Sequence, residues 1–116
     1  MKYSEFLKKV NSKDSKDSKD KEDQFLKDLE AVKQSGLALK FVMNQTPEIC
    51  LEAVKQNGYA LEYVEKQTPE ICLEAVKQYG LALRYVTNQT PEICIQAVKQ
   101  NGTALRYVKK DIFDNE

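Results

Sequence analysis

Residues 45–66 read QTPEICLEAVKQNGYALEYVEK, and the two segments that follow repeat this phrase with few changes. Residues 67–88 agree with it at 17 of 22 positions, and residues 89–110 agree with residues 67–88 at 16 of 22. Residues 23–44 fit the same frame more loosely, mainly from Leu29 onward. An uninterrupted tandem period of this length is typical of solenoids, in which each unit buries its apolar face against its neighbours.

Each unit carries the signals of two helices. The tripeptide Thr-Pro-Glu at 46–48 is a helix start, with Thr as N-cap, Pro at the first helical position and an acid near the positive end of the helix dipole. We expect the first helix roughly over residues 47–56, with Gly58 as the left-handed residue that ends it. A second, shorter helix is expected roughly over residues 59–66.

Both helices have wide apolar faces. Placed at 100° per residue, the apolar side chains of each cover roughly 200° of arc, more than contact with a single neighbour requires. Helices of about ten residues are also marginal alone in water, so the units must stack. We therefore predict an all-α protein, a short α-solenoid of four tandem 22-residue helix-pair repeats with an extra N-terminal amphipathic helix. The repeats are 23–44, 45–66, 67–88 and 89–110.

The segments outside the repeats lead to three further expectations. Apolar residues at i, i+3, i+4 and i+7 predict an amphipathic helix over residues 1–11. Residues 12–22 contain no apolar residue and indicate a flexible charged linker, with a helical extension into Lys21 and Glu22 as the alternative. Residues 111–116 begin a fifth unit and stop, so Ile112 and Phe113 are expected to cover the last open face. In the first unit, Lys27 and Asp28 replace the apolar residues of the other units, as a capping unit needs.

The composition excludes most catalytic chemistry. The chain has no histidine, which removes the commonest general base and metal ligand, and it has no phosphate-binding or dinucleotide-binding motif. Cys50, Cys72 and Cys94 occupy one repeat position on the apolar arc and are expected to be buried structural thiols. We therefore expect no enzyme activity, no catalytic residue, no bound metal and no cofactor. No apolar run is long enough for a membrane span, and the N-terminus has no signal peptide, so a cytoplasmic location without a membrane partner is expected.

The candidate partner-binding residues are those that differ between units. The first helix hardly varies, whereas the turn and the second helix do, and recognition by a repeat protein must come from positions that are not repeated. Neutral drift at exposed positions would give the same pattern. The candidates are Tyr59, Glu62, Glu65, Tyr79, Arg84, Thr87, Asn101, Arg106, Lys109 and Lys110.

Charge also differs along the stack, although 18 basic and 18 acidic residues give zero net charge. The second unit is acidic and the fourth is basic, with Arg106, Lys109 and Lys110 close together. A general binder of polyanions normally carries a basic excess over the whole domain. The zero balance disfavours a nucleic-acid partner but leaves a dipolar strip that a specific partner could recognise.

The repeated phrase resembles a family of helical 22-residue repeats of unknown function found in bacteria, protists and giant viruses. The resemblance is close over residues 45–110 and moderate over residues 29–44. It implies a repeat module without an assigned activity, ligand or catalytic residue.

Our leading hypothesis is a non-catalytic protein–protein interaction module. In a chain of this size it could be a small inhibitor or adaptor that occludes a larger partner, such as a nuclease of a defence system. One alternative is a nucleic-acid-binding repeat protein that uses Arg84, Arg106, Lys109, Lys110 and the tyrosines. The other is a structural protein that self-assembles through the ends of its solenoid.

Overall fold

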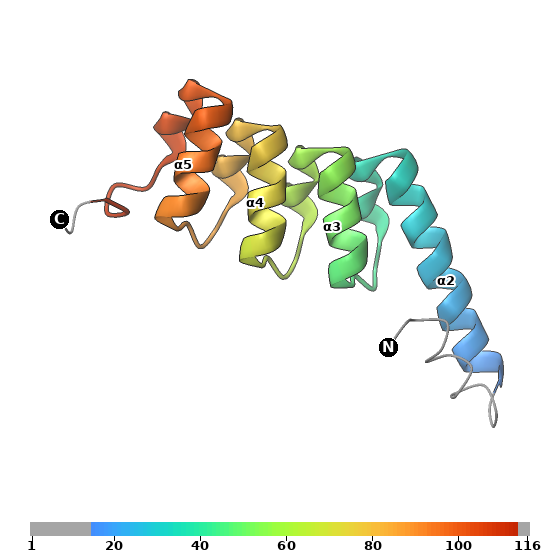
Figure 1. Cartoon of the computed structure of the whole chain (residues 1–116). Coiled ribbons are helices and arrows are strands. Elements are labelled where there is room, and N and C mark those ends of the chain that lie inside the picture. The colour runs from blue at the N-terminus through green and yellow to red at the C-terminus, as the bar shows by residue number, and fades with distance from the viewer. Residues whose placement is uncertain (1–14, 114–116) are drawn as a thin grey trace.

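The computed structural model describes residues 15–113, and its regular elements in this range are all helices (Figure 1). Long and short helices alternate along the chain. The order is α2 (Ser15–Gln34), η1 (Gly36–Phe41), α3 (Pro47–Gln56), η2 (Gly58–Tyr63), α4 (Pro69–Gln78), η3 (Gly80–Tyr85), α5 (Pro91–Gln100) and η4 (Gly102–Tyr107). None of these helices is long and apolar enough to cross a membrane.

The helix pairs stack in tandem, which confirms the predicted all-α solenoid. The α-helices lie side by side in one layer and the η helices form a second layer behind them (Figure 1). Each α-helix after the first packs on both helices of the preceding unit. The body is elongated, 57 × 28 × 18 Å, with α2 at one end and η4 at the other (Figure 1).

The start of each repeated α-helix follows the predicted cap chemistry. The hydroxyl of Thr46 accepts a hydrogen bond from the backbone N–H of Ile49 at 3.2 Å, and Pro47 occupies the first helical position. Thr68 and Thr90 cap α4 and α5 at the same distance. The helix expected over residues 47–56 therefore has the predicted bounds.

The second helix of each unit differs from the prediction in type and length. It is a six-residue 3₁₀ helix, Gly58–Tyr63 in the second unit, instead of a helix over residues 59–66. The side chain of Gln45 explains where it ends, because its amide donates to the carbonyl of Tyr63 at 2.7 Å and accepts from the N–H of Glu65 at 3.0 Å. These backbone groups are unavailable to a longer helix, and short segments suit the 3₁₀ form.

Gly58 does not have the predicted left-handed conformation. No residue within 15–113 has a positive φ, and the residue that ends α3 is Asn57, in an extended conformation. Glycine is required at position 58 for another reason. An added Cβ would lie 2.6 Å from the carbonyl oxygen of Ala75 in the next unit. The glycine thus sets the distance between neighbouring units.

The charged segment before the repeats is helical from Ser15 onward, so the prediction of a flexible linker over residues 12–22 is wrong for most of its length. The alternative, a helical extension, describes it. Adding residues to an existing helix requires no new nucleation, and α2 contains neither Gly nor Pro. The amphipathic helix expected over residues 1–11 lies outside the described residues, as do residues 114–116.

Candidate interaction surface

One row of exposed side chains runs along each 3₁₀ helix. Three residues per turn place positions i and i+3 of such a helix in line. In the second unit Tyr59, which is half-buried, and Glu62, which is exposed, lie in this line. The exposed Glu65 follows two residues after the helix ends, whereas Ala60, Leu61 and Val64 are buried. The four rows together form a surface that we call the outer ridge. It consists of Leu37, Lys40, Met43, Tyr59, Glu62, Glu65, Leu81, Arg84, Thr87, Thr103, Arg106 and Lys109.

The structure brings most of the predicted partner-binding residues together on this ridge. Those on it are Tyr59, Glu62, Glu65, Arg84, Thr87, Arg106 and Lys109. Tyr79 and Asn101 lie in the turns that precede η3 and η4, and Lys110 follows the end of the last row. The predicted candidates therefore lie along the layer of 3₁₀ helices and not on the α-helices.

The turn residues have a structural role that differs between units. Asn57 accepts a hydrogen bond from the N–H of Tyr59 at 2.9 Å, and Asn101 accepts one from Thr103 at 3.0 Å. Tyr79 makes no side-chain cap and stacks on Tyr59 instead, with ring centroids 4.9 Å apart and planes inclined by 27°. This pair forms an aromatic patch in the middle of the stack, because Tyr79 remains 43% exposed.

Cationic side chains lie over the aromatic residues beside the ridge. The guanidinium of Arg84 is 5.2 Å from the ring centroid of Tyr85 and 5.7 Å from that of Tyr107 in the next unit. The guanidinium of Arg106 is 5.6 Å from the ring of Tyr107. Two of the tyrosines that the nucleic-acid alternative would use, Tyr85 and Tyr107, are therefore already engaged with cations of the same chain.

The glutamine that opens each Gln-Thr-Pro phrase has a role that was not predicted from the sequence. Gln67 donates to the carbonyl of Tyr85 at 2.7 Å and accepts from the N–H of Thr87 at 3.1 Å. Gln45 and Gln89 make the equivalent bonds in their own units. Each glutamine thus ties the end of a 3₁₀ helix to the start of its own α-helix. The sequence signal for this role is that a glutamine precedes the Thr cap in three units. A glutamine in a loop is usually exposed to solvent, so the recurrence alone did not indicate a structural bond.

The three cysteines are buried free thiols, as predicted. Burial raises the pKa of Cys50 and Cys72 to about 11, with the charge of Glu65 adding to the effect at Cys50, and burial also raises the pKa of Cys94. Each Sγ lies 3.3–3.5 Å from the side-chain oxygen of its glutamine and donates to it. Protonated thiols in such contacts are neither nucleophiles nor metal ligands. Within residues 15–113, no group of three or more acidic or cysteine side chains could hold a metal ion.

Comparison with known proteins finds a family that matches the chain in two overlapping segments. A family described as a domain of unknown function, DUF4116, matches residues 46–90 and again residues 68–113. Each match spans about two of the structural units, and the second is displaced by one unit from the first. No curated protein and no solved structure matches the chain.

Proposed function

Because the chain belongs to the DUF4116 family, whose function is unknown, we propose a function from its surface: a non-catalytic module that binds a partner protein through the outer ridge. The observation that carries this proposal is the contrast within each 3₁₀ helix. The buried columns repeat nearly unchanged from unit to unit, whereas the exposed column carries a different set of three side chains in each unit, although Arg84 matches Arg106 and Leu37 matches Leu81. A stack of similar units holds the differing side chains at regular spacing, as a recognition surface requires.

The chemistry of the ridge indicates the kind of partner. Glu62 and Glu65 make its second unit acidic, and Arg106 and Lys109 make its fourth unit basic. The stacked pair of Tyr59 and Tyr79 joins the acidic unit to the third unit. Exposed tyrosine and arginine side chains are the types that contribute most to protein interfaces. We propose a protein partner that carries a basic patch and an acidic patch in the opposite order. Occlusion of such a partner by an inhibitor or adaptor is one form of this activity.

The test uses the full chain as bait with matched charge reversals. Arg84 lies on the ridge, and Lys77 lies in the same unit on the last turn of α4. Arg84→Glu and Lys77→Glu replace one cation by one anion and therefore change the net charge equally. We expect a protein captured by the wild-type chain to be lost with Arg84→Glu and kept with Lys77→Glu. Equal capture by both variants would place the interaction elsewhere and contradict the proposal.

A nucleic-acid partner predicts a different result. Binding of a labelled RNA or DNA oligonucleotide would weaken steeply as salt rises, and Arg84→Glu would reduce it by removing one of the cations that this alternative assigns to phosphate contacts. The cations over Tyr85 and Tyr107 favour the protein partner, because the ring faces that would stack bases already carry Arg84.

A further inference from the structure

The two ends of the stack expose large apolar side chains. Leu26 is 50%, Phe41 74% and Met43 95% exposed in the first unit, and Leu105 is 65% and Ile95 46% exposed in the last. Among the large hydrophobic residues described, the others that are exposed are Leu37, Tyr79 and Phe113. Of these, Phe41, Ile95 and Leu105 are more exposed than their counterparts in the other units, whereas the positions of Leu26 and Met43 are exposed in every unit.

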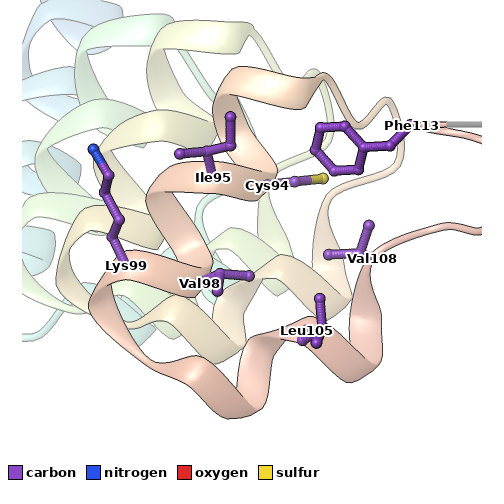
Figure 2. A pocket seen from close by; sticks show the side chains of 7 residues that line it. All are labelled: Cys94, Ile95, Val98, Lys99, Leu105, Val108 and Phe113. Atoms are coloured by element: carbon purple, nitrogen blue, oxygen red, sulfur yellow. The ribbon is translucent and has the colours of Figure 1, made fainter. Parts of the chain in front are cut away.

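The C-terminal end face has the same residues as the buried interface between units. Leu105 occupies the repeat position of Leu61 and Leu83, which are fully buried by the unit that follows each of them. Beside it, Ile95, Val98 and Val108 line an open apolar groove of about 240 Å³, and the ring of Phe113 covers one corner (Figure 2). The tail residues predicted to close this face therefore cover only part of it.

The last glycine shows that this face can accept another backbone. A Cβ at Gly36 or Gly80 would lie 2.3 Å from a carbonyl oxygen of the next unit, that of Ala53 or Ala97. A Cβ at Gly102 would meet nothing within 4 Å. Gly102 thus leaves room at the end of the stack for a close contact that the chain itself does not make.

The N-terminal end face has the complementary positions. Ala31 is exposed in α2, whereas Ala53 and Ala75 at the same repeat position are fully buried against the preceding unit. Phe41 is exposed, whereas its counterpart Tyr107 lies beneath Arg84 of the preceding unit. Among the described residues, these two positions lack the cover that a preceding unit gives to their counterparts.

We propose that a second copy of the chain docks its first unit on the last unit of the first copy, head to tail, continuing the interface between repeats. This register places Ala31 of one copy against Gly102 of the other, and Phe41 beneath Arg106. The position of Leu26 then falls beside Ile95, as Glu70 falls beside Leu51 within the chain. The contact differs from the outer ridge, so it does not depend on the proposed partner protein.

Lys27 and Phe113 would both affect the contact between the two copies. Lys27 would replace the buried Ile49 of an internal junction, and its ammonium can reach solvent while its methylene stem packs. Phe113 has the repeat position of Pro47 and lines the groove, so it must move aside for the second copy. A chain that ends at Lys110 is therefore expected to associate at least as strongly as the full chain, and weaker association would contradict this docking mode.

The main experiment measures oligomer size by sedimentation over a range of concentrations. We expect the wild-type chain to grow with concentration, and Leu105→Asp and Phe41→Asp each to stop growth. An equimolar mixture of these two variants is expected to form a one-to-one dimer, because each blocks the opposite end. Tyr79→Asp, in the middle of the stack, is the control and is expected to associate like the wild type.

Gly102→Ala provides the sharpest variant, because its methyl group meets nothing within the chain. It should leave the circular dichroism melt of the monomer unchanged and weaken association about tenfold or more. A wild-type chain that stays monomeric at every concentration overturns the proposal. A dimer that persists in both Leu105→Asp and Phe41→Asp also contradicts it, because a head-to-tail contact needs both ends. Association that is unchanged by Gly102→Ala contradicts it as well. Arg84→Glu separates the two proposals, because it is expected to lose the partner protein without changing self-association.

Discussion

Gly58 and Ala75 bring two neighbouring units into backbone contact. The carbonyl oxygen of Ala75 would lie 2.6 Å from a Cβ at Gly58, a distance that real Cβ atoms do not adopt. That oxygen also accepts the hydrogen bond from the N–H of Tyr79 that ends α4, so it cannot turn away without breaking the end of the helix. The same relationship recurs at each internal junction and determines how closely the units stack.

Gly58→Ala is expected to lower the free energy of unfolding by about 2–3 kcal/mol, because the added methyl group must push the units apart. Gly102→Ala makes the same chemical change, but its Cβ would meet nothing within 4 Å. It should therefore change the free energy of unfolding of the monomer by less than about 0.5 kcal/mol. Urea unfolding followed by circular dichroism compares them. Equal losses would show that helix geometry, and not contact between units, requires the glycine.

Gln67→Ala tests the glutamine that closes each unit. The substitution leaves the carbonyl of Tyr85 and the N–H of Thr87 without their partner and should cost about 2–3 kcal/mol. Asp23 occupies the same repeat position in the first unit and is exposed within α2, so Asp23→Ala is the matched control with little expected effect. Indistinguishable unfolding curves for the two variants would contradict the proposed role.

The sequence was a good guide wherever the deciding contacts are local. Thr46 caps a helix that begins one residue later, and the apolar pattern of α3 identifies its buried face, so both could be predicted. The end of η2 depends on Gln45, which lies 18 residues before Tyr63, and the role of Gly58 depends on a carbonyl in another unit. Such contacts are not visible in local periodicity.

The candidate surface was predicted residue by residue but not as a surface. Variation between units pointed to Tyr59, Glu62 and Glu65, and a step of 100° per residue spreads these three positions over about 120° of arc. The 3₁₀ step of about 120° brings Tyr59 and Glu62 into line, and Glu65 follows two residues after η2 has ended. Knowledge of the helix type therefore turns a set of variable positions into a continuous ridge.

Ala75→Asp tests the stacking frame as a whole. Ala75 is fully buried between units, and a carboxylate there would have neither solvent nor a partner. We expect a loss of about 4 kcal/mol or more, enough to unfold a chain of this size. Arg84→Ala changes an exposed residue and should leave the chain folded, with a loss of only about 0.5–1 kcal/mol from its contacts with Tyr85 and Tyr107. A native melt for Ala75→Asp would show that the units do not pack in this register.

The buried thiols predict a slow reaction with thiol reagents. Cys50, Cys72 and Cys94 are all less than 5% exposed, and their raised pKa values keep them protonated near neutral pH. A colorimetric disulfide reagent should label the native chain slowly and all three thiols rapidly in urea. Rapid labelling of the native chain under the same conditions would show that the units open far more readily than their packing implies.

The same thiols make the fold sensitive to alkaline pH in a defined direction. Burial raises the pKa of Cys72 from 9.0 to about 11, so between these values the folded chain binds more protons at this thiol than the unfolded chain does. The contribution of this thiol to the free energy of unfolding is therefore fully present below about pH 9 and is lost as the pH rises towards 11. Tyrosines and lysines also titrate in this range, so the wild type must be compared with Cys72→Ala. We expect the wild type to lose stability more steeply than Cys72→Ala across the window. Parallel curves would mean that the thiolate is as well solvated in the fold as in the unfolded chain.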